Sequence, residues 1–399
     1  MKILILCGVY SDKVEQEVLR DARRAVEFSA NLMQKKIISA ARESSHEITV
    51  LSAPFLGAFP NASSRLFFRG FDTPCTEYTY VPFCNLWGVR NLSRAASLKR
   101  AMRAFLKQDG EKLVLAYCPH TPFLKAAAFA KRRDPKIRTC LYVPDLPEYM
   151  NLSAHVSPIY KFAKFFDIRA MHRAMRKIDS FVLLTEQMKE RLPVGEKPCL
   201  VCEGLVTKDA LTAAKEIAPE KKESTPAVVY TGKLDERFGC KTLVDAMKHV
   251  TVPCRLVLCG TGDALPYARE AAKNDPRILP LGQVTPAEAK ERQQNAAVLV
   301  NPRAGEEEYT KFSFPSKNLE YLLTGHAVVA HFLAGMPDVY RIFLTSPKDE
   351  SAEALAAALT DALSESDEKR QEKHLAFLTY AEEHLLSSSV FETILQMGI

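Results

Sequence analysis

The residues best suited to chemistry in this 399-residue chain lie in a loop that spans residues 231–239. Gly232 and Gly239 enclose two cations, Lys233 and Arg237, between a strand-like apolar run and a helical pattern. Glycine lets backbone amides approach an anion closely, and the N-terminus of the following helix favours negative charge. The loop therefore predicts a phosphate-binding site, although a tight turn with solvated charges is the commoner use of such a segment.

A second loop follows the next strand-like run, where one threonine separates Gly260 from Gly262. A lone Gly-x-Gly is weak evidence, because such turns occur in most α/β proteins. This one falls at the same predicted sheet edge as the first loop. We therefore include both glycines in the predicted anion site.

A third segment supplies the remaining candidates of the second half. Arg303 follows a strand-like run, and Ser316 is expected to cap a helix that carries Lys317 and Glu320. The Ser316 hydroxyl and the first-turn amides can donate hydrogen bonds to phosphate oxygens, and Lys317 adds positive charge. Glu320 can accept two hydrogen bonds from a ribose, or it simply stabilises the positive end of its helix.

The elements that must position these loops alternate between apolar runs and helical patterns. Predicted strands cover residues 3–7, 47–51, 113–117, 139–143, 180–185, 227–231, 255–259, 297–301 and 327–330. Predicted helices cover residues 15–42, 95–107, 186–192, 241–250, 264–274, 286–295 and 316–324, with a helical tail from residue 368. This alternation indicates parallel sheets covered on both faces. A polar stretch at residues 218–224 is typical of a linker between two such halves.

In the first half, the candidates again follow predicted strands. Gly8, after the first, would let a ligand approach the backbone closely. Asp145 lies between two prolines and is our candidate for an acceptor-side contact, or it initiates a turn. His120 ends the preceding strand at the same edge, where a structural histidine is the simpler interpretation and a substrate contact the alternative.

Aromatic and basic residues interleave at 160–169 and again at 64–69. This pattern suits a helix lying on anionic lipid, or an ordinary helix packed on its own domain. If both segments face one side of the molecule, they favour a lipid-linked acceptor.

Composition limits the classes of function. Two domains are the default for this length, and 47% hydrophobic with 26% charged residues is typical of a globular protein. The net charge of +6 suits acidic small molecules or an anionic membrane surface, and no nucleic-acid module is recognisable. No apolar run is long enough to span a membrane, and ten scattered cysteines favour a reduced, cytoplasmic protein. We therefore expect a cytoplasmic location, either free or peripheral on the cytoplasmic face of the membrane.

The motifs resemble those of the family 4 glycosyltransferases, retaining enzymes of the GT-B fold. Gly232-Lys233-Leu234 is similar to the family's donor loop, and Gly260 and Gly262 to its strand-ending Gly-x-Gly. The pattern from Phe314 to Gly325, Phe-Pro-Ser-Lys with Leu-Glu-Tyr-Leu and Gly, resembles the bacterial surface-polysaccharide branch. The resemblance implies that the loop cations bind a nucleotide diphosphate and that Glu320 binds the ribose. Two positions depart from the family: Phe312 replaces the first glutamate of a Glu-seven residues-Glu motif, and Phe238 replaces a lysine, with Arg237 as substitute.

The expected fold is α/β, GT-B, with two Rossmann-like domains facing across a cleft, at residues 1–205 and 206–375. Residues 376–399 are expected to form a helix that crosses back to the first domain. The resemblance implies retaining transfer of a sugar from a nucleotide-diphosphate donor to a saccharide or lipid-linked acceptor. Lys233 and Arg237, with Lys317, would stabilise the leaving diphosphate, and Asp145 would act on the acceptor side. No Asp-x-Asp motif occurs, so no metal and no cofactor are required.

Three other functions stay open. A nucleotide-sugar epimerase would convert the donor without an acceptor, and a phosphorylase would need free phosphate. A catalytically silent homologue would serve as a partner in a polysaccharide assembly complex and bind a sugar nucleotide without turnover.

Overall fold

The chain forms two compact units. A computed structural model describes residues 1–24, 26, 28–150, 158–216 and 225–397. Unit 1 contains Met1–Thr207 and Leu386–Ile399, and unit 2 contains Lys208–Leu385. The sequence-based division fell at residues 205/206 and 375/376. The linker expected at residues 218–224 lies outside the described residues.

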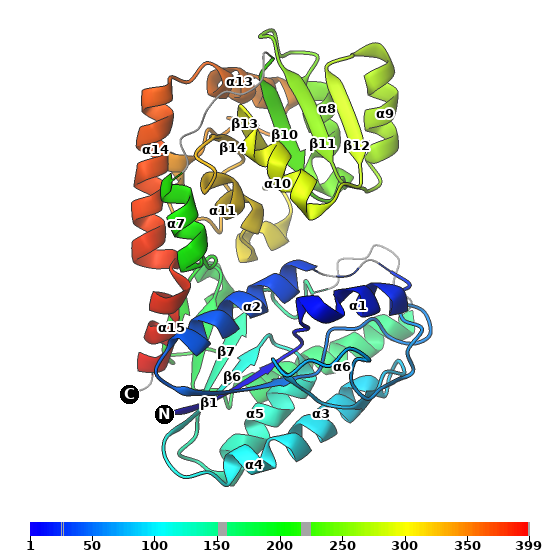
Figure 1. Cartoon of the computed structure of the whole chain (residues 1–399), viewed down its shortest axis with the longest axis vertical. Helices are drawn as coiled ribbons and strands as arrows, with labels where there is room; N and C mark the ends of the chain where they lie inside the picture. The colour runs from blue at the N-terminus through cyan, green and yellow to red at the C-terminus, as the bar shows by residue number, and fades with distance from the viewer. Residues whose placement is uncertain (25, 27, 151–157, 217–224, 398–399) are drawn as a thin grey trace. The chain divides into compact units, whose positions relative to one another are not determined.

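Unit 1 is built on a seven-stranded parallel sheet in the order β4-β2-β1-β6-β7-β8-β9 (Figure 1). The strands are β1 (Lys2–Cys7), β2 (Glu47–Ser52), β4 (Thr79–Tyr80), β6 (Lys112–Tyr117), β7 (Arg138–Val143), β8 (Ser180–Leu183) and β9 (Cys199–Val201). The central strands are buried along almost their whole length, as expected for a sheet covered on both faces. A separate antiparallel pair joins β3 (Phe67–Phe68) to β5 (Phe83–Cys84).

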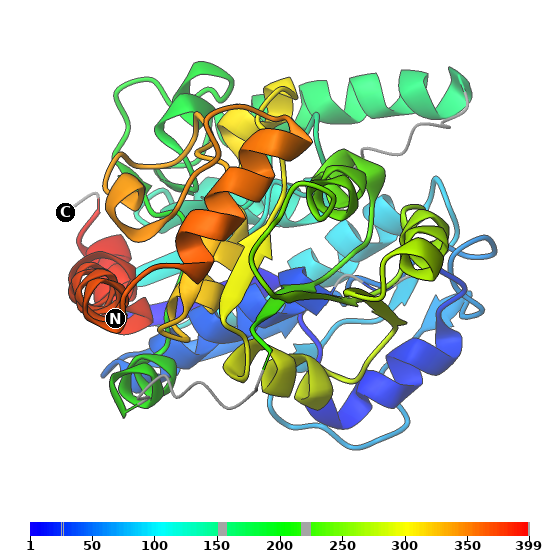
Figure 2. The same cartoon turned by 90° about the horizontal axis from the view of Figure 1, so that it is seen from above.

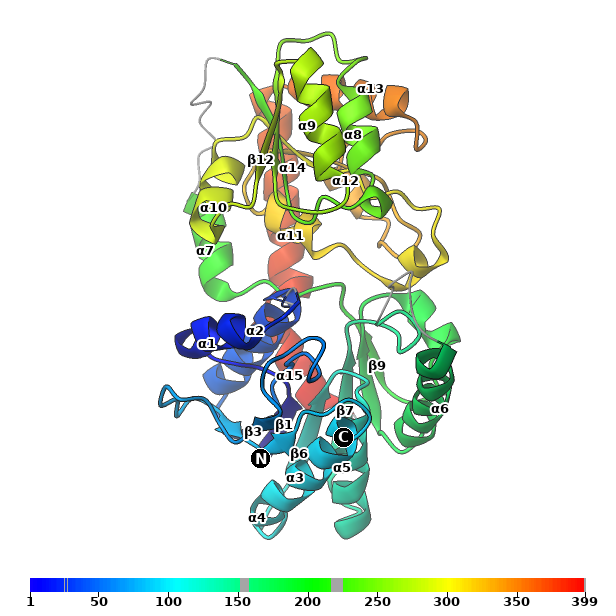
Figure 3. The same ribbon diagram turned by 90° about the vertical axis from the view of Figure 1, so that its right-hand side faces the viewer.

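The helices of unit 1 form two layers. The bounds are α1 (Glu15–Asp21), α2 (Phe28–Glu43), α3 (Arg90–Ala101), α4 (Arg103–Leu106), α5 (Thr121–Arg133), α6 (Pro158–Met175) and α15 (Ser387–Gln396). Helices α3, α5 and α6 pack in a row, whereas α15 packs on α2 (Figures 1 and 3). Right-handed crossovers explain the two layers, because the strand order grows in opposite directions from β1.

Three predicted helices of unit 1 differ from the structure. The expected helix at 15–42 is broken, because Ala22 is extended and pairs with Ser63. The helix expected at 95–107 begins earlier, at Arg90, and ends as the separate α4. The segment expected to be helical at 186–192 forms a 3-10 helix, Glu186–Glu190.

Unit 2 contains a five-stranded parallel sheet in the order β12-β11-β10-β13-β14. Its strands are β10 (Ala227–Thr231), β11 (Arg255–Cys259), β12 (Ile278–Gly282), β13 (Val298–Asn301) and β14 (Ala327–Ala330). The sequence analysis missed β12, which contains Pro280. Proline is tolerated there because β12 is an edge strand.

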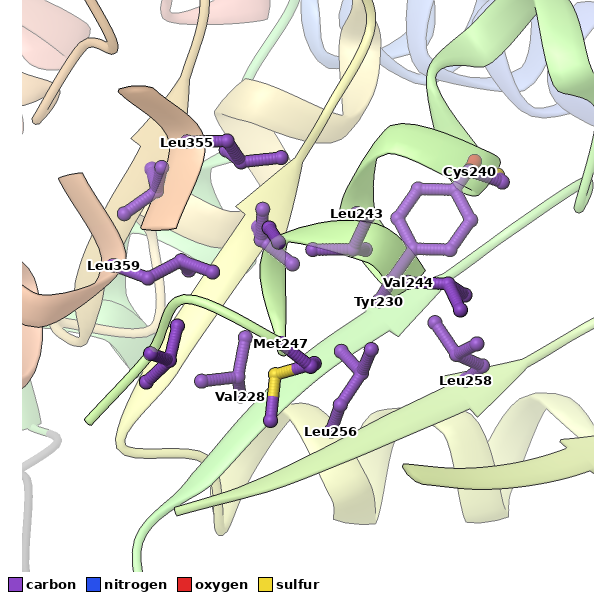
Figure 4. Close-up of a cluster of buried hydrophobic side chains, with 14 of the residues drawn as sticks. Val228, Tyr230, Cys240, Leu243, Val244, Met247, Leu256, Leu258, Leu355 and Leu359 are labelled. Carbon is purple, nitrogen blue, oxygen red and sulfur yellow. The ribbon is translucent and has the colours of Figure 1, made fainter. Parts of the chain in front are cut away.

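The helices of unit 2 are α7 (Lys208–Glu216), α8 (Cys240–Ala246), α9 (Leu265–Asn274), α10 (Pro286–Gln294), α11 (Ser316–Leu322), α12 (Tyr340–Phe343), α13 (Ala352–Leu363) and α14 (Asp367–Tyr380). Figure 2 shows α8 and α9 next to each other on one face of the sheet, and α13 packs against α8. The core between this layer and the sheet joins strand residues such as Val228, Leu256 and Leu258 to Leu243, Met247 and Leu355 (Figure 4). This core fixes the carboxyl ends of β10 and β11, where the predicted loops begin.

The C-terminal segment changes units after Leu385 rather than near residue 376. Helix α14 packs against α7 and α12 and therefore stays in unit 2. Helix α15 then returns to unit 1, where the Arg138 guanidinium donates a 2.8 Å hydrogen bond to the Leu395 carbonyl. Both units are α/β with parallel sheets, as the sequence predicted.

Candidate functional site

Two predicted loops of unit 2 lie side by side at the carboxyl ends of neighbouring strands. The Leu234 amide donates to the Thr261 carbonyl at 2.9 Å, and the Ala264 amide donates to the Leu234 carbonyl at 2.9 Å. Strands β10 and β11 are direct neighbours, so their loops extend from the same edge. In open parallel sheets this edge is the usual place for ligands.

The two glycines of the second loop, Gly260 and Gly262, are required by contact with the backbone of the first loop. A Cβ on Gly260, whose φ is +144°, would lie 1.7 Å from the Gly232 carbonyl oxygen. A Cβ on Gly262 would lie 2.1 Å from the Leu234 carbonyl oxygen. The amides of Gly232 and Gly260 donate to the carbonyls of Cys259 and Gly282. These two amides are therefore used within the sheet edge, and the place of Gly232 and Gly260 in the anion site stays a prediction.

The cations of the first loop share a buried carboxylate. Asp235 has only 3% of its side chain exposed and contacts Lys233 Nζ at 3.1 Å and Arg237 Nη2 at 2.7 Å. The hydrogen bonds from Arg237, together with Lys233, hold the pKa of Asp235 well below its usual range although burial opposes this. The side chains of Lys233 and Arg237 remain 61% and 45% exposed. Asp235 thus fixes two solvent-facing cations and leaves a net positive charge.

A polar network connects the end of β10 to α11. Lys317 Nζ lies 3.2 Å from Thr231 Oγ1 and 3.1 Å from Glu320 Oε2. Gln293 Nε2 donates to Thr231 Oγ1 and to Glu320 Oε1, each at 2.7 Å. The buried Tyr321 hydroxyl accepts from the Thr231 amide at 3.0 Å. Lys317 and Glu320 are therefore held beside the first loop, as the sequence predicted from their helix.

Arg303 lies against aromatic rings. Its guanidinium is 4.8 Å from the centroid of Tyr309 and 5.6 Å from that of Phe238, and it donates to Ser313 Oγ at 3.0 Å. Arg237 also approaches the Phe238 ring, at 6.0 Å. Among the described residues, the buried Arg303 Nε has no hydrogen-bond partner. Phe238 is thus placed between the two arginines.

Two residues of the third segment differ from expectation. Pro315, not Ser316, is the N-cap of α11, and no side chain caps this helix. Ser316 is its exposed first residue, because the extended backbone of Pro315 sets the start. Phe312 is buried, with 3% of its surface exposed, so it packs in the interior.

The structure also identifies site residues that the sequence analysis missed. Asp235, Thr231, Gln293 and Tyr321 contact or position the predicted cations. Asp235 stands two residues from both Lys233 and Arg237, a spacing that would have suggested pairing. Gln293 is distant in sequence and had no such signal.

The candidates of unit 1 follow β1, β6 and β7, which are neighbours in its sheet. At Gly8 the close approach is made by Phe55: a Cβ would lie 2.5 Å from its ring, and the Gly8 amide donates to Gln34. Packing against Phe55 is thus one reason for a glycine at this position, and the approach of a ligand to Gly8 stays a prediction. The His120 ring also packs edge-on against Phe55, with 5.9 Å between the ring centroids.

His120 and Asp145 differ in exposure. Burial holds the pKa of His120 well below its usual range, and its buried Nδ1 has no hydrogen-bond partner among the described residues. Asp145 is exposed. Burial raises the pKa of the Cys118 thiol most, and the charge of Asp145 raises it further. The structure thus places Asp145 near the end of β6, on the same edge as His120.

The remaining features concern metals, membranes and surface patches. In the part of the chain that the structure describes, no cluster of three or more His, Cys, Asp or Glu side chains is arranged to hold a metal. None of the described helices is long and apolar enough to cross a membrane. The basic-aromatic segment at 64–69 is only partly open: Phe67 and Arg69 are exposed, whereas Phe68 is buried and Arg65 pairs with Asp21 at 2.6 Å.

Solved structures define the class of this protein as GT-B. Sucrose-phosphate synthase from Thermosynechococcus elongatus matches with a TM-score of 0.64 at 14% identity, over 99% of this chain and 98% of that one. Anabaena HepE in complex with UDP matches with a TM-score of 0.60 at 13% identity, over 99% of both chains. A trehalose-phosphate synthase from Burkholderia xenovorans, in complex with glucose-6-phosphate, gives 0.62 at 11% identity, also over 99% of both.

A family model matches part of the chain. Residues 225–365, about a third of the sequence, match the model described as Glycosyl transferases group 1. The match contains the glycine loops, Arg303, Lys317 and Glu320. No curated protein has a significant sequence match to the chain. The resemblance to glycosyltransferases that the motifs indicate is confirmed over these residues. The retaining mechanism and the bacterial surface-polysaccharide branch stay predictions.

Proposed function

We propose that this protein transfers a sugar from a nucleotide-diphosphate donor to a saccharide or lipid-linked acceptor, with retention, in the synthesis of a cell-surface polysaccharide or glycolipid. One observation carries the donor assignment: Lys233, Arg237 and Lys317 gather at the end of β10, within the family match. Three cations around a single strand end suit a diphosphate.

The proposed mechanism rests on the charge that develops on the leaving group. As the bond between the sugar and the diphosphate breaks, negative charge grows on the diphosphate oxygens. Cations already held in place stabilise that charge without reorganising. Asp235 holds Lys233 and Arg237, and Thr231 and Glu320 hold Lys317. Glu320 remains 49% exposed, so its carboxylate can accept hydrogen bonds from ribose hydroxyls.

The acceptor side is proposed to be the carboxyl edge of the unit 1 sheet, with Asp145 and His120 as contacts. In this proposal the protein's own cations do the work that a divalent metal does in other transferases, so no metal or cofactor is needed. We further propose that the protein acts in the cytoplasm. The likeness to HepE in complex with UDP supports testing uridine nucleotides first.

Calorimetric titration with a panel of nucleoside diphosphates and NDP-sugars tests the donor site. We expect one nucleotide to bind at micromolar strength and Lys317→Ala to abolish that binding. Lys290→Ala, which changes an exposed lysine on α10, is the matched control and should bind normally. If a well-folded protein binds none of the panel, the donor assignment fails.

Turnover separates the remaining functions. The nucleotide identified by binding is supplied as its sugar conjugate, with and without acceptors, and release of the nucleoside diphosphate is followed. Release that depends on the acceptor supports the transferase. Conversion of the sugar without acceptor would indicate an epimerase, and dependence on phosphate a phosphorylase. Binding without turnover would indicate a silent partner protein.

A further inference from the structure

Helix α6 exposes three phenylalanines in one stripe. Phe162, Phe165 and Phe166 leave 69%, 51% and 53% of their surface open. Spacings of three and four residues place them on one face of the helix. Their rings contact one another, with centroid distances of 4.8 Å for Phe162–Phe166 and 5.5 Å for Phe165–Phe166. A contiguous exposed group of this kind marks an interaction surface.

The stripe is not the face with which α6 packs on its own unit. Met171 and Met175 are buried, and Asp167 accepts a hydrogen bond from the Thr121 hydroxyl of α5. Contacts between α5 and α6 are extensive. Because another face of α6 already supplies this packing, the phenylalanines are available for a partner.

Cations continue the same surface. Arg169 and Arg173 are exposed and follow Phe162 by seven and eleven residues, which keeps them on its face. The Arg169 guanidinium lies 4.8 Å from the Phe165 ring centroid, and Lys161 is exposed next to Phe162. Among the described residues, none of these three cations forms an ion pair. Of the nearby acids, Glu148 contacts His172 at 3.2 Å and Asp167 accepts from Thr121.

A second exposed apolar segment leads into α3. Leu86, Trp87, Val89 and Leu92 leave 40%, 50%, 44% and 61% of their surface open. Helix α3 belongs to the same layer as α5 and α6 (Figure 3). Arg90 lies within this segment. Burial lowers its pKa overall, although the charges of Tyr160 and Asp167 act in the opposite direction. Both α3 and α6 pack on α5, so this segment is a second exposed apolar group, separate from the phenylalanine stripe.

We propose that this surface binds an anionic lipid bilayer, with its aromatic side chains inserted between headgroups and its cations paired with lipid phosphates. We call it the lipid surface and define it by six residues of α6: Lys161, Phe162, Phe165, Phe166, Arg169 and Arg173. Apolar side chains beside cations that form no ion pair among the described residues are complementary to the interface of an anionic membrane. Large aromatic side chains suit that interface because they are apolar and rigid.

The inference rests on α6. It does not depend on the proposed function, but it deepens it. A surface that holds unit 1 on a bilayer brings the acceptor-side edge of that unit to a substrate carried in lipid. A lipid-linked acceptor is then favoured over a soluble saccharide.

Flotation of the full chain with large unilamellar vesicles tests the lipid surface. One set is phosphatidylcholine alone, and the other contains about one third phosphatidylglycerol. We expect binding to the anionic vesicles, weakened when the salt is raised from about 0.1 M to about 0.5 M. The double variant Phe162→Ser/Phe165→Ser should bind at least about tenfold more weakly. Leu375→Ser, on a helix of unit 2 with a similar exposed fraction of 55%, should bind like the wild type.

Charge reversal tests the cations of the lipid surface. Arg169→Glu and Arg173→Glu should each weaken binding to anionic vesicles by about fivefold, whereas Lys290→Glu should not. Nucleotide binding by calorimetry and the melting temperature are measured for every variant, so that loss of folding is separated from loss of lipid binding. Unchanged nucleotide binding with lost vesicle binding is the expected pattern.

Three outcomes would overturn the proposal. The first is that the wild type floats with neither kind of vesicle. The second is that the phenylalanine variant floats as well as the wild type. The third is a concentration-dependent dimer in light scattering that Phe162→Ser/Phe165→Ser abolishes without any vesicle binding, which would assign the surface to a second copy of the chain. Failure of nucleotide binding alone would not affect this inference.

Discussion

The two sheets share the order of their central strands, but the side chains at their carboxyl ends differ in chemistry. In unit 2 that end holds Lys233, Asp235, Arg237, Lys317 and Glu320 in a network of ion pairs. In unit 1 it is lined by aromatic rings, with Phe55 against His120 and Phe123 and with Tyr117 stacked on Tyr142. A charged ligand requires cations fixed in advance, and such cations occur as a recognisable motif in the sequence. An uncharged sugar or a lipid-linked chain requires shape and apolar surface, and these requirements produce no recognisable motif.

The largest expected effect follows from the different roles of glycine at the two ends. Gly260→Ala forces a Cβ to within 1.7 Å of a backbone oxygen at a φ of +144°, so neither partner can move aside cheaply. We expect it to cost about 3 kcal/mol or more of stability and to abolish nucleotide binding. Gly8→Ala meets the side chain of Phe55, which can rotate, and should cost about 1–2 kcal/mol. Chemical denaturation of both variants checks the order, and equal costs would remove this contrast.

The next prediction concerns the acceptor side. Asp145→Asn should lower turnover by about 100-fold while the affinity for the donor nucleotide stays within about twofold. Asp109→Asn, another exposed aspartate of unit 1, is the control. Steady-state rates and calorimetry give the two quantities separately. If the affinity for the donor nucleotide falls as well, the carboxyl edges of the two sheets do not bind acceptor and donor separately, as proposed.

Asp235→Asn sharpens the interpretation of the ion pairs. Removing a negative charge makes the site more positive, so simple attraction predicts tighter binding of a diphosphate. If Asp235 instead holds Lys233 and Arg237 in position, affinity should fall by about tenfold. Asp338→Asn, at a surface position, should change nothing. Tighter binding in calorimetry would assign Asp235 a merely neutralising role.

The smallest effect is a difference in acid sensitivity. Burial lowers the pKa of His326, His331 and His374 in unit 2 below the usual 6.5. The unfolded chain then binds protons more readily than the folded one, so stability is fully present above pH 6.5 and falls as the pH drops below it. Each histidine contributes at most about 1.4 kcal/mol per pH unit.

Thermal melts between pH 7.5 and 5.5 check this sign. His374→Gln should reduce the slope of the unfolding free energy against pH, compared with the exposed His249→Gln. A slope unchanged by His374→Gln would show that this imidazole does not contribute to the acid sensitivity.

Much of the fold could be predicted from the sequence, because parallel strands buried on both faces appear as continuous apolar runs. The runs at Ile3–Cys7 and Ala227–Thr231 were found for this reason. Strand β12 was missed because Pro280 interrupts it, and the break at Ala22 depends on pairing with Ser63, a tertiary contact. Neither feature has a local signal.

The cluster at the end of β10 was also largely predictable, since Lys233, Arg237, Lys317 and Glu320 occur in motifs. Their partners Gln293 and Tyr321 were not predicted, because distant segments bring them to the end of β10. At Gly8 the residue type was read correctly as requiring close approach, but the sequence did not indicate that the approaching group is Phe55. The role of the acceptor-side residues stays a prediction.

The return of α15 to unit 1 has a consequence for synthesis. Ile37, Ile38 and Ala41 of α2 are buried in the finished molecule, and α15 is a helix that packs on α2. A ribosome makes α2 well before α15, because the whole of unit 2 lies between them in the sequence. Until unit 2 has been translated, α2 lacks its contacts with α15. Unit 1 therefore cannot reach its final stability before α15 has been made, and a protein truncated after Leu385 would lack one of the helices that pack on α2.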